Sequence, residues 1–233
     1  MNPHPHISEQ FDTELEQARS LLMEMGGIVE QQLRNACQAL TTHDTELADT
    51  VRQADDQVNQ LEIDLDELCV QIIALRQPAA TDLRTLISIM KASTDLERVG
   101  DEAERIAAMA IAVAQFEYPA DQYNDIRNLG TKAATMVSSA LDVFARVDAD
   151  EAINVIKADT EIDVGYEAVV RDRAKEMTRQ PEQIERALHV IWAARALERI
   201  GDHAKNISEY VVFLAHGEDV RHSSINDAQT PTG

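Results

Sequence analysis

Apolar residues recur along the chain at steps of three and four, and the clearest run begins at residue 47. The positions of this run, which alternate steps of four and three residues, are Leu47, Val51, Ala54, Val58, Leu61, Leu65, Leu68, Ile72 and Leu75. A period of 3.5 residues is typical of the seam of a helix in a bundle or coiled coil. Because a fully buried Leu, Ile or Val contributes about 1.5–3 kcal/mol, we expect this seam to lie against partner helices.

Helix caps and turn-forming residues divide the chain into six predicted helices, so the fold class we expect is all-α. With only 8 glycines and 6 prolines in 233 residues, long helices are favoured over many short strands. Asp44 and Asp148 are placed to cap two of the helices. Pro78 and Pro181 suit the first turn of a helix, and Gly217 suits a C-terminal stop. The predicted helices span about 8–42, 44–77, 78–116, 121–147, 148–179 and 181–216.

The chain contains an internal duplication. The stretch DLERVGDEAERIA at 95–107 returns as ALERIGDHAKNIS at 196–208, and Arg-Gln-Pro occurs at both 76–78 and 179–181. Short links between long helices make neighbouring helices antiparallel, so we expect two tandem three-helix bundles. The predicted units are residues 1–117, residues 118–217 and a polar, frayed tail at residues 218–233.

The formal net charge of −21 narrows the range of partners. Nucleic acid and anionic membrane surfaces would be repelled, which leaves basic protein surfaces and metal cations. The sequence shows neither a signal peptide nor a run of 18 apolar residues, so we expect a cytoplasmic protein without direct membrane insertion. Cys37 and Cys69 lie in different predicted helices and form no CxxC pair, so we expect reduced core residues.

Each copy of the duplicated motif carries two carboxylates four residues apart, which places both on nearly the same face of a helix. These carboxylates border apolar positions, where an unpaired charge would cost several kcal/mol. Carboxylates of the preceding helices also border the apolar seams, and they are additional candidates for the same site. The candidate residues are Glu97, Asp101, Glu198 and Asp202, with Asp55, Glu62 and Asp159 as possible additions.

Three explanations for these carboxylates are open. Arg195 lies one turn from Glu198, and Lys205 one turn from Asp202, so ordinary ion pairs can form. Alternatively, carboxylates at i and i+4, completed from a neighbouring helix, suit a divalent or iron-type cation. A paired-carboxylate acid–base site is the third explanation. It has no accompanying nucleophile, and His203 points away from Asp202 on a helix and is expected at the surface. HExxH, P-loop and GxGxxG motifs are absent from the sequence, and we expect no enzymatic activity.

Gly100 and Gly201 lie inside the two motif helices, where each glycine costs about 1 kcal/mol relative to alanine. Close packing of a neighbouring helix is the simplest explanation for a glycine at this position. Room for a bound ion or a water molecule beside the carboxylates is the alternative.

Taken together, these motifs resemble the PhoU family, and the resemblance covers residues 7–217. The matching segments are the two LERxGD motifs, Arg-Gln-Pro, Asp-Leu-Arg at 82–84, MGGIVEQQL at 25–33 and FARVDADEA at 144–152. The resemblance implies two tandem three-helix bundles, a homodimer and a cytoplasmic location. It also implies a negative regulator of the phosphate-starvation response and of phosphate uptake. Such a regulator bridges a sensor histidine kinase and the nucleotide-binding subunit of the phosphate ABC transporter.

The same resemblance implies a metal at the Glu-x-x-x-Asp motifs of some family members, while other members are metal-free. The family positions fall on Glu97, Asp101, Glu198 and Asp202. Three functions are therefore weighed: a regulatory adaptor that requires no cofactor, a metal-binding protein or metalloenzyme, and a purely structural scaffold. We expect the adaptor, with a cation at the motifs as a secondary prediction.

Overall fold

The computed structural model describes residues 5–116 and 123–217 of the chain, and all regular structure in these ranges is helical. This confirms the predicted all-α class. The described elements are α1 (Pro5–Thr42), α2 (Thr45–Gln53), α3 (Asp55–Arg76), α4 (Ala80–Val113), α5 (Asn124–Arg146), α6 (Ala149–Arg179), η2 (Pro181–Gln183) and α7 (Ile184–His216). The predicted tail at 218–233 lies outside the described residues. None of the described helices is both long and apolar enough to cross a membrane.

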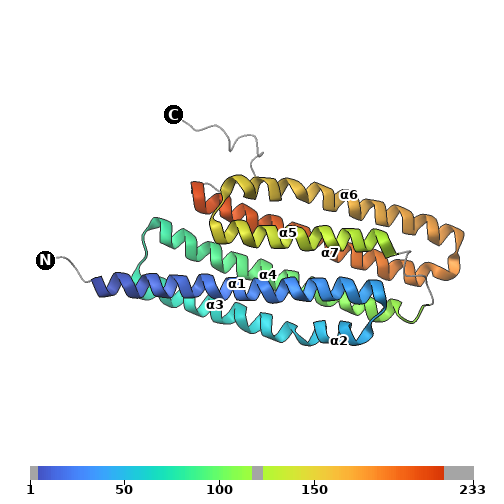
Figure 1. Cartoon of the computed structure of the whole chain (residues 1–233), viewed down its shortest axis with the longest axis horizontal. Helices are drawn as coiled ribbons and strands as arrows, with labels where there is room; N and C mark the ends of the chain where they lie inside the picture. Colours follow the sequence, from blue (N-terminus) through green and yellow to red (C-terminus); the bar gives the residue numbers. More distant parts are fainter. Residues whose placement is uncertain (1–4, 117–122, 218–233) are drawn as a thin grey trace.

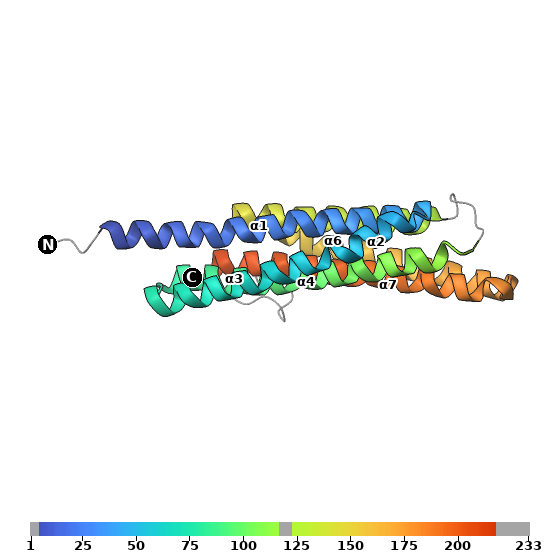
Figure 2. The same cartoon turned by 90° about the horizontal axis from the view of Figure 1, so that it is seen from below.

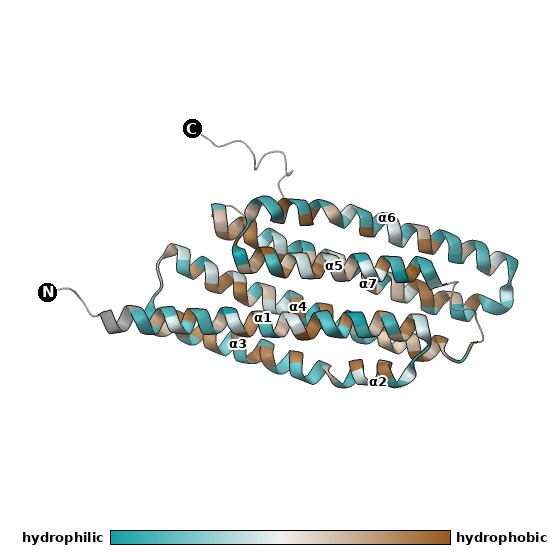
Figure 3. Ribbon diagram, viewed as in Figure 1, coloured by the Kyte–Doolittle hydropathy of each residue, from teal (hydrophilic) through white to brown (hydrophobic). Residues whose placement is uncertain are grey.

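The helices form two groups that lie side by side (Figure 1). Helices α1 to α4 pack against one another, as do α5, α6 and α7, and the groups meet where α4 lies along α7 and α1 along α5. Figure 2 shows α1 and α5 in one layer and α4 and α7 in the layer beneath. Apolar and polar positions alternate along each helix (Figure 3), and the buried apolar residues join into one core that extends through both groups.

The contact between α1 and α5 is reciprocal. A Cβ atom added at Gly26 would lie 2.7 Å from Leu141 Cδ2, and one added at Gly130 would lie 2.7 Å from Cys37 Sγ. Gly130 follows Gly26 by the same 104 positions by which Leu141 follows Cys37. Each helix therefore inserts a side chain against a glycine of the other, as a duplicated arrangement with approximate twofold symmetry requires. The residue at which one copy ends and the next begins stays a prediction.

The helix predicted at 44–77 is in fact two helices. Asp44 caps α2 as predicted, because its Oδ1 accepts a hydrogen bond from the Leu47 amide at 3.0 Å. At Ala54, where ψ is −11°, the backbone forms a tighter turn: the Gln57 amide donates to the Ala54 carbonyl at 3.3 Å. The new helix α3 then starts at Asp55, so this carboxylate lies in a first turn.

Leu75 was predicted in the buried seam but is 66% exposed. Val58, Leu65 and Ile72, spaced by seven residues, are buried as predicted. A straight helix with 3.6 residues per turn drifts by about 20° per seven residues from a 3.5-residue repeat. The drift turns the end of α3 away from the core, and Leu75 lies in its last turn.

Other helix ends follow local chemistry. Gly217 ends α7 as predicted, with a left-handed φ of 77° and an amide that donates to the Phe213 carbonyl at 2.8 Å. Pro78 was expected inside a first turn, but α4 begins at Ala80. The residue before a proline is disfavoured in the α conformation, and Gln77 takes a left-handed φ of 48° that ends α3.

Candidate functional site

The first acidic cluster, which consists of Asp55, Glu62, Glu97 and Asp101, lies where α3 packs on α4. Burial raises the pKa of Glu97, and the charges of Asp101, Glu62 and Asp55 raise it further. Burial likewise raises the pKa of Asp55, with added repulsion from Asp101. The structure therefore brings together the carboxylates that were predicted from the sequence as candidate site residues in this half of the chain.

The cation beside the first cluster is exposed. Arg98 Nε lies 3.4 Å from Glu97, and its Nη1 lies 3.5 Å from Asp101. The Arg98 side chain is 52% exposed, so solvent screens its attraction to both carboxylates. Inside the cluster, Asp55 Oδ2 accepts a hydrogen bond from the neutral Asn59 amide at 3.0 Å.

The second acidic cluster consists of Asp159 and Asp163 from α6 with Glu198 and Asp202 from α7. Burial raises the pKa of Glu198, and the charge of Asp202 raises it further. Burial also raises the pKa of Asp202, followed by repulsion from Asp159. Asp159, Glu198 and Asp202, which were predicted as candidate site residues, are thus neighbours. Asp163 was missed, although it lies four residues after Asp159.

The ion pairs of the second cluster are only partly those expected. Arg195 pairs with Glu198, as predicted. Lys205 was expected to pair with Asp202, but its Nζ donates to Asp159 Oδ2 at 2.8 Å. Asp159 is only 5% exposed, whereas Asp202 keeps an exposed surface and is only partly desolvated. The buried carboxylate has lost its water and therefore gains more from the ammonium group.

Several buried polar atoms in these clusters have no hydrogen-bond partner among the described residues. In the first half they are Gln32 Oε1, Gln32 Nε2, Asp55 Oδ1 and Asn59 Oδ1, and in the second they are Asp159 Oδ1 and Glu198 Oε2. Leaving such a group unsatisfied costs about 1–3 kcal/mol. Gln32 was missed at the sequence level because it belongs to no acidic motif. Its position three residues after Val29 and four before Ala36, both fully buried, indicates a core-facing side chain.

The two motif glycines have different surroundings. A Cβ at Gly201 would lie 3.1 Å from Ile162 Cγ2 and 3.3 Å from Asp159 Oδ1, which is the tight helix contact that we expected. A Cβ at Gly100 would instead meet Gln32 Oε1 at 3.4 Å and Asp55 Oδ1 at 3.6 Å, which are ordinary contacts. Both glycines thus border an unpartnered aspartate oxygen, but only Gly201 also lies tightly against an apolar side chain.

The two acidic clusters have the chemistry of a site for a hard cation, because all of their candidate ligand atoms are oxygens. The carboxylates also repel one another, which a cation would relieve. In the described ranges, however, no three His, Cys, Asp or Glu side chains converge closely enough to hold a metal ion. The residues therefore fit a cation by type and charge, and binding one requires side-chain rotation.

A buried hydrogen-bond network that the sequence did not reveal joins α4 to α7. Asp95, which is 7% exposed, accepts hydrogen bonds from Asn206 Nδ2 at 3.1 Å and from the Tyr210 hydroxyl at 2.7 Å. His203 was predicted at the surface, but its Nδ1 lies 2.7 Å from Asp95 Oδ1. The only signal in the sequence is that an aspartate precedes the first LERxGD motif where Ala196 precedes the second.

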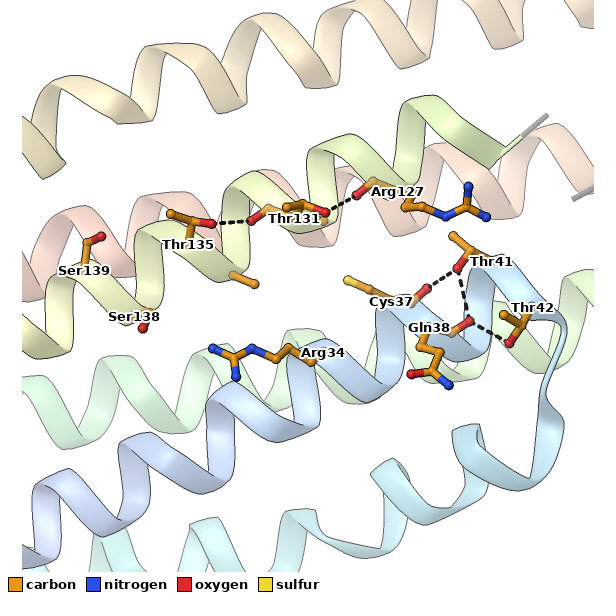
Figure 4. Close-up of a pocket in the computed structure, with 12 residues that line it drawn as sticks. Arg34, Cys37, Gln38, Thr41, Thr42, Arg127, Thr131, Thr135, Ser138 and Ser139 are labelled. Carbon is orange, nitrogen blue, oxygen red and sulfur yellow. Dashed lines mark hydrogen bonds between the residues drawn. The ribbon is translucent and has the colours of Figure 1, made fainter. Parts of the chain in front are cut away.

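A cavity of about 620 Å³ lies between α1 and α5 (Figure 4), and no residue of either acidic cluster lines it. Its wall includes Arg34, which pairs with Glu30 at 2.7 Å, and several hydroxyl groups. Many of these hydroxyls donate to helix carbonyls, as Thr41 does to Cys37 at 2.9 Å. The labelled side chains do not point toward one common centre (Figure 4), so we assign no chemistry to this cavity.

Comparisons with known proteins match both halves of the chain. The PhoU domain family matches residues 22–110 and 126–211, which include both acidic motifs. A phosphate-specific transport system accessory protein PhoU homolog from Pseudomonas aeruginosa is 49% identical over 93% of this chain and 90% of that protein. The accessory protein PhoU of Escherichia coli strain K12 is 40% identical over 95% of this chain and 92% of that protein.

Solved structures show the same fold. The crystal structure of PhoU from Pseudomonas aeruginosa matches with a TM-score of 0.86 at 48% identity, covering 89% of this chain and 100% of that chain. The phosphate transport system regulatory protein PhoU from Streptococcus pneumoniae matches with a TM-score of 0.84 at 30% identity, covering 90% of this chain and 99% of that chain. The similarity therefore spans the whole helical arrangement and not a single motif.

Proposed function

Because the chain belongs to the PhoU family, we propose that it regulates phosphate transport and represses the phosphate-starvation response when phosphate is plentiful. In this proposal it is a cytoplasmic, homodimeric adaptor between the nucleotide-binding subunit of the phosphate ABC transporter and the sensor histidine kinase. The observation that carries the proposal is the similarity, at 40–49% identity over more than nine-tenths of the chain, to accessory proteins of phosphate-specific transport.

The architecture supports an adaptor, because an adaptor needs exposed surface rather than a set of converging catalytic groups. The first turns of α7 carry such a surface. Ile184, Leu188 and Trp192, spaced by four residues, lie along one face of the helix and are 42%, 36% and 52% exposed. An exposed apolar stripe of this kind is typical of a contact with another protein.

The test is complementation of a bacterial strain that lacks its own PhoU-family gene and carries a reporter for the phosphate-starvation response. With phosphate in excess, we expect the reporter to be active in the deleted strain and repressed when this chain is expressed. Expression is checked by immunoblot, and an empty vector is the control. A folded, well-expressed chain that leaves the reporter fully active would refute the adaptor.

We also propose a second property, the binding of a divalent or iron-type cation by the acidic clusters. The raised pKa values of Asp55, Glu97, Glu198 and Asp202, with the unpartnered buried oxygens beside them, support this proposal. The test is metal analysis by mass spectrometry of protein purified without an affinity tag. A matched variant carries Glu97→Gln, Asp101→Asn, Glu198→Gln and Asp202→Asn. Metal in the unaltered protein and none in the variant supports a cation site. If neither protein contains metal, the carboxylates serve in ion pairs or in a docking surface instead.

A further inference from the structure

The side of α4 and α7 that faces away from α1 and α5 carries a row of basic side chains. Lys91, Arg98 and Arg105 follow one another at steps of seven residues, so they lie on one face of α4, about 10 Å apart along its axis. Gly100, two positions after Arg98 and therefore on the opposite side of α4, lies beside Gln32 of α1. Because α1 and α5 form the other layer of the molecule (Figure 2), they leave this row uncovered.

The row continues onto α7. Arg199 Nη1 and Arg105 Nη1 contact the same atom, Glu102 Oε1, at 2.7 and 2.6 Å. Glu102 is 2% exposed, whereas the side chains of Arg105 and Arg199 are 56% and 39% exposed. One carboxylate balances only one of the two guanidinium groups, so this part of the surface keeps a positive charge.

One end of the row has a cation without a carboxylate partner. Lys91 makes no ion pair with any described residue, and its Nζ lies 5.6 and 5.9 Å from the ring centroids of Tyr210 and Phe213. Lys91 and Arg98 line one cavity of about 490 Å³ between α3, α4 and α7. The ammonium group is therefore held in place beside a hollow in the surface.

The acidic groups near this row are less exposed than its cations. Asp95 is buried and accepts its hydrogen bonds from α7. Glu97 and Asp101 are both less exposed than Arg98, the cation that contacts them. Asp66 is half-buried at the α3 side of the cavity. In a chain with 42 acidic and 21 basic residues, the exposed charge of this face is thus opposite in sign to that of the whole molecule.

The other end of the row is aromatic. Met109 of α4 lies against His189 of α7, whose Nδ1 is 3.4 Å from Met109 Sδ. The His189 ring in turn meets the exposed Trp192 edge-on, with ring centroids 5.2 Å apart. From Lys91 to Met109 the helix rises about 27 Å, and over this length the surface changes from cationic to aromatic.

We infer that the α4–α7 face docks an acidic amphipathic helix of a partner protein. The face consists of Lys91, Arg98, Arg105, Arg199 and Trp192. The inference rests on the adaptor role proposed above and adds the docking surface and the chemistry of the partner segment. Guanidinium groups bind carboxylates through paired hydrogen bonds, and an exposed tryptophan is a strong anchor in protein interfaces. Seven residues make nearly two turns in any α-helix, so carboxylates at steps of seven on the partner stay in register with the three cations of α4.

The width of the face limits the partner to a narrow segment. Acidic clusters border it on both sides, with Glu97 and Asp101 toward α3 and Glu198 and Asp202 toward α6. Nucleic acid, an anionic membrane or a broadly acidic protein surface would meet these carboxylates and be repelled. A single helix with acidic side chains along one face reaches the cations and avoids both clusters.

The first experiment is photo-crosslinking in cells grown with excess phosphate. p-Benzoylphenylalanine replaces Thr94, an exposed residue that lines the same cavity as Lys91 and Arg98. The matched control places it at Thr131, an exposed threonine of α5. We expect the probe at Thr94, and not the one at Thr131, to crosslink the nucleotide-binding subunit or the sensor kinase within a helix rich in Asp and Glu.

The second experiment is co-purification of the full chain carrying Lys91→Glu and Trp192→Ala. We expect recovery of the crosslinked partner to fall by about tenfold or more, because a cation becomes an anion and the aromatic anchor is lost. The control Lys157→Glu makes the same charge change at an exposed position of α6 and leaves recovery unchanged. Circular dichroism verifies the helical content of every variant.

The other outcomes overturn the inference in ways that can be told apart. If the double variant recovers both partners as well as the unaltered chain does, the α4–α7 face is not the docking site and the adaptor role stands. The same conclusion follows if the probe at Thr94 crosslinks no protein, only a second copy of this chain, or a partner segment without acidic residues. If the unaltered chain recovers neither partner, the adaptor role and this inference fail together.

Discussion

At the scale of single residues, Gly100 and Gly201 occupy the same position of the motif but should respond differently to a methyl group. Gly100→Ala is expected to raise the free energy of unfolding by about 1 kcal/mol through helix propensity, because its nearest contacts begin at 3.4 Å. Gly201→Ala is expected to lower it by about 1–2 kcal/mol, since its Cβ would lie 3.1 Å from Ile162. Urea unfolding measures both, and equal shifts would contradict the contrast.

The ion pair between Glu14 of α1 and Arg76 of α3 gives a prediction for pH. Arg76 donates to the two Glu14 oxygens at 2.7 and 3.0 Å, and this hydrogen bonding lowers the pKa of Glu14 below its ordinary value of 4.5. The stabilisation is therefore present above that ordinary pKa and is lost as the pH falls through the lower native value.

We expect the unaltered protein to be more stable than Glu14→Gln at neutral pH, and the difference to shrink as the pH falls below about 4. Chemical unfolding of both proteins across that range measures the difference. A difference that is constant with pH would mean that the pair does not contribute through the charge of Glu14.

At the scale of helices, the packing of α4 on α7 depends on one buried carboxylate. Asp95→Ala would remove the carboxylate that accepts hydrogen bonds from the Tyr210 hydroxyl and Asn206 and that contacts His203, so we expect the free energy of unfolding to fall by about 3 kcal/mol. The matched control is Thr94→Ala, at the exposed neighbouring position, which should change it by less than about 1 kcal/mol. A loss of stability for Asp95→Ala no larger than that for Thr94→Ala would show that this network does not stabilise the packing of α4 on α7.

The same scale shows which features a sequence can predict. The caps at Asp44 and Gly217 depend on residues within one turn, so they can be predicted from the local sequence. The exposure of Leu75 depends on how α3 turns relative to its neighbours along its length, and the break at Ala54 has no cap or turn residue that marks it in the sequence.

The candidate site likewise has a part that the sequence predicts and a part that it does not. The pairing of Glu97 with Asp101 follows from their spacing on one helix. The contacts of Lys205 with Asp159, of His203 with Asp95, and the approach of Gln32 to Gly100 all cross between helices. The sequence alone does not show how α1 packs on α4, α4 on α7 or α6 on α7, so it gives no way to predict these contacts.

At the scale of the whole molecule, the described apolar core is continuous between the two groups of helices, so the halves should unfold together. We expect one cooperative transition in urea, with the same midpoint by far-UV circular dichroism and by fluorescence of Trp192. Trp192 is the single tryptophan of the chain and lies in α7. A fluorescence midpoint distinct from the circular dichroism midpoint would show that the halves are separate folding units.

The central proposal is that this chain acts as an adaptor in phosphate transport. Its most direct test is co-purification of the chain, at its native expression level and from cells grown with excess phosphate, with the nucleotide-binding subunit of the phosphate transporter and with the sensor histidine kinase. We expect both proteins to be recovered with the chain and neither to be recovered from a strain that lacks it. Recovery of the folded chain without either protein would contradict the account.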